Sequence, residues 1–297
     1  MLFLNSSKTA HACGVYQYGK RLLHILQKRL IVNYQEVETK EEYVQCVTNC
    51  KDPIVIINYH SSLFPWFTKE MENITTAKYY YIYHESGLPE GVLPSQVLNT
   101  DPTATYGIPL PRPIFLPKTV SQKSTNIICP KIGSFGFGFA NKNFPKIVSM
   151  VQEQFDWAII YLHIPFSYYG DKEGVSAVSI SQQCKDIIRK PGIQLYVTHD
   201  FVTDETLSEF LSSNDLNIFL YEEGEGRGCS SVLDFAVGVN TPIAVSNSQM
   251  FRHIYDDSIC AYKRPFIDII LEDPIYIKSF REKWSHTNLT RVFASLL

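Results

Sequence analysis

Residues 216–246 constrain the fold of this chain more than any other stretch. The stretch begins with a mostly apolar run that is typical of a largely buried strand. The loop after it, 222–228, holds three glycines, three acids and one arginine. An apolar helical stretch follows at 232–239, and a second short strand is predicted at 243–245. These elements form one βαβ unit whose glycine-rich loop lies at the carboxyl end of a strand, where ligands bind in open α/β sheets.

The glycine-rich loop carries groups that suit an anionic ligand. Free backbone N–H groups at the start of the helix, beside glycines that allow close approach, can bind a phosphate. Arg227 can add a charge-assisted contact, and a nearby acid can accept hydrogen bonds from sugar hydroxyls. The alternative interpretation is a flexible acidic turn without a ligand, because glycine-rich motifs have many false positives.

The rest of the chain alternates strands with helices, which favours parallel sheets. The expected strands are 2–4, 34–37, 54–58, 79–83, 96–99, one within 127–135, 157–164, 193–198, 216–221 and 243–245, and the expected helices are 15–30, 41–50, 144–155, 176–189, 203–213, 232–239, 278–284 and 289–297. The Pro-rich segment 107–117 cannot be regular helix, and we place a linker near 112–126. The fold class is therefore α/β, with a first domain over 1–118 and a second over 119–297 that includes the C-terminal helices.

The composition excludes several classes of protein. Hydrophobic residues make up 45% of the chain and charged residues 19%, so a substantial core is expected. The net charge of −3 gives no global basic field for nucleic acid or an anionic membrane. Seven scattered cysteines indicate reduced, intracellular thiols rather than a disulfide framework. With neither a signal peptide nor a membrane-spanning stretch in the sequence, we expect a cytoplasmic protein.

Other motifs are missing from the sequence. No His, Cys, Asp and Glu residues have metal-ligand spacing, so no essential tightly bound metal is expected. The glycines at 133, 136 and 138 do not fit the dinucleotide-binding fingerprint. A nucleophile elbow and a P-loop are also missing. These observations argue against an NAD-dependent oxidoreductase, a simple hydrolase and an NTPase.

Two histidines lie just after predicted strands. His84, followed by Glu85, comes after 79–83, and His60 comes after 54–58. We expect the His84 imidazole to point into a cleft between the domains, with His60 and Glu85 on the acceptor side. The alternative for each histidine is a local hydrogen bond in a loop without a ligand.

Three stretches resemble nucleotide-sugar glycosyltransferases of the GT-B fold, especially the large retaining family. Residues 12–15 look like the family's glycine loop after its first strand. Residues 136–148 resemble the segment in which the family has a phosphate-binding lysine, here Lys142, and 203–246 looks like its acidic donor region. The resemblance covers most of the chain, most firmly 127–250, and it implies two Rossmann-like domains facing a cleft.

The resemblance also implies the activity. The chain would move a sugar from a nucleotide-sugar, UDP- or GDP-linked, to an acceptor hydroxyl, with retention and without a metal or other cofactor. It implies that His84 positions the sugar, that Glu225 holds sugar hydroxyls, with Glu222 and Glu223 competing for that role, and that Asp234 binds the ribose. The donor-binding residues that it implies are Gly14, Lys142, Arg227, Gly228, Cys229, Ser230, Ser231 and Asp234.

Departures from the family's pattern leave other functions open. The family's arginine before the lysine is missing, and the acids Glu225 and Asp234 are one residue further apart than usual. A degenerate, non-catalytic binding subunit and a sugar-nucleotide epimerase are therefore the alternatives. The acceptor is a glycan, a lipid-linked glycan, a protein, a small molecule or a modified DNA base. Nucleic acid is not indicated, because the one basic cluster (Lys20, Arg21, Lys28 and Arg29) is interpreted as a solvated helix face.

Overall fold

A computed structural model of the 297-residue chain describes residues 1–6, 13–84, 87–117, 127–224, 228–272 and 275–297. The chain divides into two compact units. Of the described residues, the first unit contains those within 1–113, residue 228 and residues 283–297, and the second contains those within 114–224 and 229–282. The predicted boundary at 118/119 and the linker at 112–126 fall partly outside the described residues.

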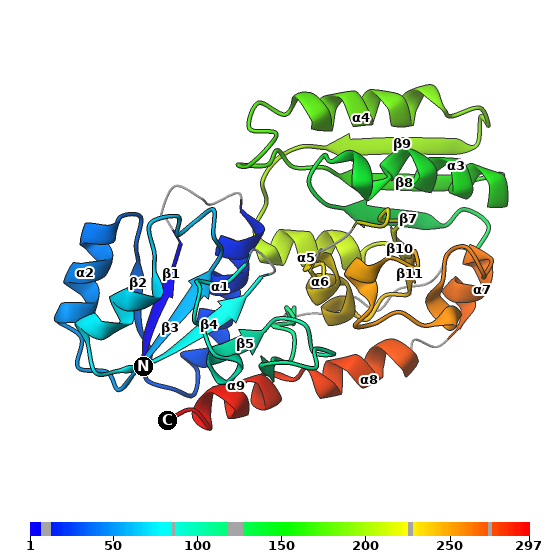
Figure 1. Ribbon diagram of the computed structural model, residues 1–297. Helices are drawn as coiled ribbons and strands as arrows, with labels where there is room; N and C mark the ends of the chain where they lie inside the picture. Colours follow the sequence, from blue (N-terminus) through cyan, green and yellow to red (C-terminus); the bar gives the residue numbers. More distant parts are fainter. Residues whose placement is uncertain (7–12, 85–86, 118–126, 225–227, 273–274) are drawn as a thin grey trace. The chain divides into compact units, whose positions relative to one another are not determined.

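The first unit has a parallel sheet whose strand order reverses once. Its strands are β1 (Leu2–Asn5), β2 (Asn33–Glu36), β3 (Ile54–Tyr59), β4 (Lys78–Tyr83), β5 (Val97–Asn99) and β6 (Ile108–Pro109). They are ordered β2-β1-β3-β4-β5-β6, and every pairing is parallel (Figure 1). The chain moves from β1 outward to β2 and then returns to β3 on the other side of β1. The sheet therefore has a topological switch point between β1 and β3.

The helices of the first unit are α1 (Gly14–Leu26), α2 (Lys40–Thr48) and α9 (His286–Ala294). The apolar face of α1 is buried in the core, as its spacing of apolar residues predicts. Leu289 and Phe293 of α9 are buried in the same core. The prediction that assigned the C-terminal helices to the second domain is therefore wrong for α9. The short amphipathic pattern of α9 predicts that the helix packs on an apolar surface, but the pattern does not identify which unit supplies that surface.

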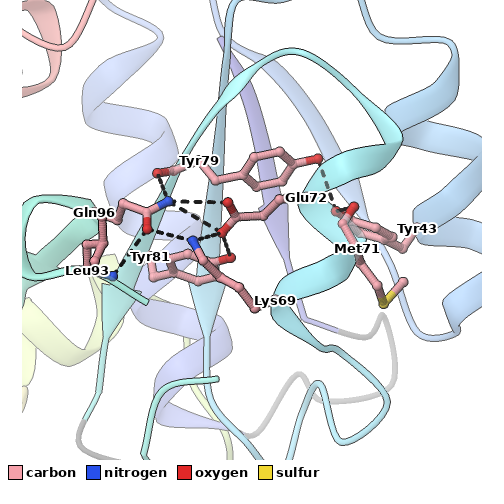
Figure 2. Close-up of polar contacts among 8 residues, drawn as sticks. All are labelled: Tyr43, Lys69, Met71, Glu72, Tyr79, Tyr81, Leu93 and Gln96. Carbon is pink, nitrogen blue, oxygen red and sulfur yellow. Dashed lines mark hydrogen bonds and ion pairs between the residues drawn. The ribbon is translucent and has the colours of Figure 1, made fainter. Parts of the chain in front are cut away.

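A polar network holds the crossover between β3 and β4 (Figure 2). The carboxylate of Glu72, in the turn η1 (Lys69–Ile74), pairs with Lys69 at 2.7 Å and accepts hydrogen bonds from the Tyr81 hydroxyl and the Gln96 amide. Lys69 also donates to Gln96 Oε1 at 2.6 Å. The members come from η1, β4 and the turn η2 (Pro94–Gln96). We interpret this network as structural, since it ties three neighbouring elements together.

The second unit repeats the same design. Its strands are β7 (Lys131–Phe135), β8 (Ala158–His163), β9 (Ile193–Thr198), β10 (Leu216–Phe219) and β11 (Ile243–Val245), and its helices are α3 (Phe144–Gln154), α4 (Val175–Asp186), α5 (Asp204–Ser212), α6 (Val232–Val239) and α7 (Phe266–Leu271), with α8 (Ile275–Lys283) ending at the unit boundary. The strand order is β11-β10-β7-β8-β9, all parallel. The switch point lies between β7 and β10.

The βαβ unit predicted at 216–246 is present as β10, α6 and β11. The strands β10 and β11 pair in parallel, and Asn240 ends α6 in the left-handed conformation with φ of 59°. Thr203 caps α5, as predicted, because its side chain accepts the Thr206 N–H at 3.2 Å. The six-residue helix α7 was not predicted, since so short a segment offers too few residues for a helical period.

Candidate functional site

The carboxyl ends of three strands bring polar side chains together in the first unit. Asn5 ends β1, Asn58 lies one residue before the end of β3, and His84 directly follows β4. These strands are neighbours in the sheet, and β1 and β3 flank its switch point. His84 therefore lies at the edge of the sheet where ligands bind in open α/β folds, and its ligand stays a prediction.

Asn5 and Asn58 form a buried pair under α1. Asn58 Nδ2 donates to Asn5 Oδ1 and to the Val15 carbonyl, both at 2.8 Å. Both asparagines have no exposed surface. Gly19 of α1 leaves the space for this pair, since a Cβ at Gly19 would lie 2.5 Å from Asn58 Nδ2 and 2.6 Å from Asn5 Oδ1. Neither asparagine was among the predicted site residues, although Asn5 ends an apolar strand and Asn58 interrupts one.

His84 joins this pair. Its Nε2 lies 2.7 Å from Asn58 Oδ1, and its ring meets the Tyr18 ring edge to face at 4.8 Å. Burial, the charge of Arg112 and the nearby His60 lower the pKa of His84 to about 3. The imidazole is therefore neutral at physiological pH. A neutral imidazole can form a hydrogen bond with a hydroxyl but brings no positive charge to a phosphate.

A buried arginine supplies positive charge at the same end of this sheet. Arg112 is 1% exposed, and its Nη1 donates to the Thr100 carbonyl at 2.7 Å. Its guanidinium group lies 5.4 Å from the centroid of the Tyr18 ring. Arg112 was not among the predicted site residues. The available signal was an arginine between two prolines in an otherwise apolar segment.

The second predicted histidine, His60, directly follows β3. Its Nδ1 accepts the Ser62 N–H at 3.2 Å and lies 2.7 Å from the Ser62 hydroxyl oxygen. Burial lowers the pKa of His60. The structure thus places His60 and His84 at the ends of the neighbouring strands β3 and β4. Glu85 lies outside the described residues.

Gly14 is exposed and is the first residue of α1. The side chain of Cys13, the N-cap residue, makes no capping hydrogen bond. A Cβ at Gly14 would meet no heavy atom within 4 Å in the described part of the chain. The helix start is therefore sterically open at this residue, as the predicted phosphate contact requires. The rest of the predicted glycine loop precedes residue 13 and is not described.

In the second unit, Lys142 lies at the switch point between β7 and β10. It ends the turn η3 (Ala140–Lys142), and its Nζ lies 3.6 Å from the centroid of the Tyr221 ring. This is a cation–π contact. The loops after the two strands are also joined by the Glu222 N–H, which donates to the Asn141 carbonyl at 2.9 Å. Tyr221 was not among the predicted site residues, although it directly precedes the acidic loop.

Two glycines after β7 serve the fold. Gly136 has φ of +151°, a conformation that favours glycine. Gly138 packs so closely on α4 that a Cβ would overlap Ala177. These positions explain part of the glycine-rich sequence there without a dinucleotide ligand.

The predicted donor-binding residues at the start of α6 are largely covered by other residues. Ser230 is 7% exposed, and its N–H donates to the Met250 carbonyl at 2.9 Å. Asp234 has no exposed surface, so contact with a ribose needs movement of the residues that cover it. Gly228, Cys229 and Ser231 are half-buried. The side chain of Ser231 makes no capping hydrogen bond at the N-terminus of α6.

The structure distinguishes two of the three competing glutamates. Both carboxylate oxygens of Glu223 accept the Gln249 N–H, at 2.9 and 3.3 Å, so this side chain is bound to the start of the turn η4 (Gln249–Phe251). Glu222 is exposed. Glu225 and Arg227 lie outside the described residues. Which of the three acids would contact a sugar therefore stays a prediction.

The predicted basic cluster is not one solvated face. Arg21 is 6% exposed, and Lys20 pairs with Glu36 at 3.6 Å. Lys28 and Arg29 lie beyond the end of α1. Within the described ranges, no group of three or more His, Cys, Asp and Glu side chains is placed to hold a metal ion. Over the same ranges, no helix is long and apolar enough to cross a membrane.

Comparisons with known proteins identify the fold. No protein-family model and no curated protein sequence matches the chain. The chain is similar to HepE from Anabaena, solved with UDP and glucose, with a TM-score of 0.61, 9% identity and coverage of 100% of this chain and 99% of HepE. It is similar to AviGT4, a glycosyltransferase involved in avilamycin A biosynthesis, with a TM-score of 0.61, 9% identity and coverage of 99% and 96%.

A third solved structure extends the same likeness. The alpha-glucosyltransferase AGT, solved in complex with UDP, matches with a TM-score of 0.53, 11% identity and coverage of 97% of this chain and 94% of AGT. At such low identity the likeness shows the fold alone. The chain is an α/β protein with two Rossmann-like domains of the GT-B fold, which confirms the predicted fold class.

Proposed function

We propose that this chain is a glycosyltransferase that takes a sugar from a nucleotide-sugar. The observation that carries the proposal is the full-length likeness to HepE and AviGT4, the first solved with UDP and glucose and the second itself a glycosyltransferase. Two sheets with polar side chains at their switch points support it, since ligands bind there in open α/β sheets. UDP is the nucleotide that we propose first.

The second unit supplies the groups that suit the nucleotide diphosphate. Lys142 offers a positive charge at the carboxyl end of β7, and the N-terminus of α6 offers backbone N–H groups. Arg227, where it reaches the ligand, would add a second charge. We propose Asp234 as the ribose-binding residue once the cover over it moves, and Glu222 or Glu225 as the residue that holds sugar hydroxyls.

The proposed reaction replaces one bond at the sugar's anomeric carbon. The bond from that carbon to the diphosphate oxygen breaks, and a bond to the acceptor oxygen forms. Lys142 and the backbone amides stabilise the charge that develops on the leaving diphosphate. In the retaining course that we propose, the acceptor's proton passes to a departing phosphate oxygen, so no protein base is required. No step in this scheme uses a metal ion.

In the first unit, we propose that neutral hydrogen-bonding groups bind the sugar. His84 is neutral, and we propose that it positions the sugar by a hydrogen bond. His60 and Glu85 are proposed to face the acceptor. We also propose a cytoplasmic location, which the seven free cysteines support.

Release of nucleoside diphosphate from UDP- and GDP-sugars tests the proposal. We expect slow release with one of these donors in water and faster release when a hydroxyl acceptor is added. Interconversion of the sugar without release would support an epimerase instead. Donor binding with neither release nor interconversion, over a broad acceptor panel, would support a non-catalytic subunit.

A further inference from the structure

The hydrogen bonds around Asn5 fix the orientation of its amide. Oδ1 faces the backbone N–H of Ser6 at 2.9 Å, which can only donate. Nδ2 faces the carbonyl of Tyr16 at 3.2 Å, which can only accept. A flipped amide would place two donors together on one side and two acceptors together on the other. Asn5 therefore presents an acceptor to Asn58.

Asn58 is oriented in turn. Its Nδ2 lies 2.8 Å from Asn5 Oδ1 and 2.8 Å from the Val15 carbonyl, and both of these oxygens are acceptors. The two hydrogens of Nδ2 are thereby used. The remaining atom, Oδ1, can only accept, and it lies 2.7 Å from His84 Nε2. A short contact of this kind requires a proton on Nε2.

We propose that Asn58 is a positioning residue which holds His84 as its neutral Nε2–H tautomer, so that Nδ1 carries a lone pair and can only accept a hydrogen bond. Three backbone groups, the Ser6 N–H and the carbonyls of Tyr16 and Val15, orient the amides of Asn5 and Asn58, and these orient the imidazole. Nδ1 has no hydrogen-bond partner within the described part of the chain.

The proton pattern determines which ligand group suits this position. A hydroxyl can donate to Nδ1, whereas a carboxylate or phosphate oxygen would meet a second lone pair. Taking the ligand class from the proposed function, we infer that His84 binds a hydroxyl of a sugar and discriminates against an anionic group there. The inference about the tautomer itself does not depend on the ligand.

The neighbours of His84 keep the ring neutral. The titratable and charged groups around it are Arg112, His60 and Tyr18. The positive charge of Arg112 opposes protonation of the imidazole, and none of these three groups is an acid that would favour the cation. Glu85 lies outside the described residues.

Nitrogen NMR of the ligand-free protein tests the proposal directly. With ¹⁵N-labelled histidine, long-range proton–nitrogen correlation distinguishes a protonated ring nitrogen from one with a lone pair. The His84 signals are assigned by their loss in His84→Gln and by magnetisation transfer from the Tyr18 ring. We expect a protonated Nε2, a bare Nδ1 and no titration between pH 5 and 9. A protonated Nδ1, or a cation that titrates near pH 6.5, would overturn the proposal.

A variant at Asn58 tests whether Asn58 fixes the tautomer of His84. In Asn58→Asp the carboxylate beside Nε2 favours the imidazolium, so the pKa of His84 should rise by at least one unit. Asn99→Asp is the matched control, because it places a carboxylate at the end of β5, where the Asn99 side chain accepts the Asp101 N–H. An unchanged tautomer and titration of His84 in folded Asn58→Asp would contradict the proposed role. If that variant does not fold, the wild-type spectrum still decides the tautomer.

Discussion

At the residue scale, the candidate site of the first unit depends on the space under α1 as much as on its polar atoms. Gly19 lies above the amides of Asn5 and Asn58 at distances that leave no room for a methyl group. Gly14, five residues earlier, faces open space within the described residues. The two glycines of one helix therefore have different roles, and substitutions can separate them.

We expect Gly19→Ala to destabilise the protein. Alanine in a helix interior normally adds about 0.5–1 kcal/mol relative to glycine, but here the new Cβ would displace a buried amide. Loss of the hydrogen bonds of a buried polar group costs about 1–3 kcal/mol. Urea unfolding should show a net loss of stability, whereas Gly14→Ala should be neutral or stabilising. A gain in stability for Gly19→Ala would show that the asparagine pair is not packed as described.

Lys142 provides a residue-scale test in the second unit. Because charge-assisted hydrogen bonds contribute about 1.5–3 kcal/mol, Lys142→Ala should weaken binding of UDP about 10- to 100-fold in calorimetric titration. Lys146→Ala removes the same charge from an exposed position of α3 and should leave the affinity unchanged. Equal effects of the two substitutions would show that Lys142 acts only through the net charge.

His84 predicts a pH dependence of stability. Its pKa is about 3 in the folded state and about 6.5 when unfolded, so the unfolded state alone takes up a proton as the pH falls below 6.5. Stability is therefore complete above that pH and falls by about 1.4 kcal/mol per pH unit below it. Between pH 7.5 and 5.0, the wild type should lose about 2 kcal/mol more than His84→Gln in urea unfolding. Equal losses in the two proteins would contradict the neutral imidazole.

At the element scale, α9 belongs to the first unit although it ends the chain. Phe293 is fully buried in the core that also contains Phe3 and Leu22. Phe293→Ala should cost about 3–5 kcal/mol and raise amide exchange in β1 and β3. Protection of β7 and β8 should change less. Ala294→Ser, at an exposed neighbour, is the control, and equal loss of protection in both sheets would contradict the assignment of α9 to the first unit.

Most of the helices and strands could be predicted from the sequence, because the spacing of apolar residues that indicates each one lies within the element itself. The strand at 193–198 has its predicted bounds, and the helix at 203–213 was located by its cap, Thr203. The contacts of Asn58 could not be predicted, since they depend on residues 15 and 5, which only the fold brings near. The packing of α9 on the first unit could not be predicted for the same reason, since that core is formed by residues far from α9 in the sequence. Among site residues, Lys142 was predicted from the resemblance and His84 from its place after a strand, while Tyr221 and Arg112 fit no such pattern.

At the scale of the whole molecule, the two units use one design with different chemistry. Each has a parallel sheet with a switch point, at β1/β3 in the first and β7/β10 in the second. Neutral amides and an imidazole lie at the first point, and a lysine on an aromatic ring lies at the second.

The proposed scheme also predicts the effect of metal removal. If Lys142 and backbone amides stabilise the leaving diphosphate, dialysis against EDTA should leave the rate of diphosphate release within about twofold of its starting value. Recovery of a lost rate on addition of Mg²⁺ or Mn²⁺ would show instead that a metal ion supplies that charge.

Thermal unfolding of the whole chain in the presence of UDP-, GDP-, ADP- and CMP-sugars, with NAD as the control, tests the central claim most directly. A ligand that binds the folded state at 100 times its Kd adds about 2.7 kcal/mol of stability. We predict a rise in Tm with one nucleotide-sugar, UDP-glucose first, and none with NAD. A rise with NAD alone, or no rise with any nucleotide-sugar, would contradict the proposed function.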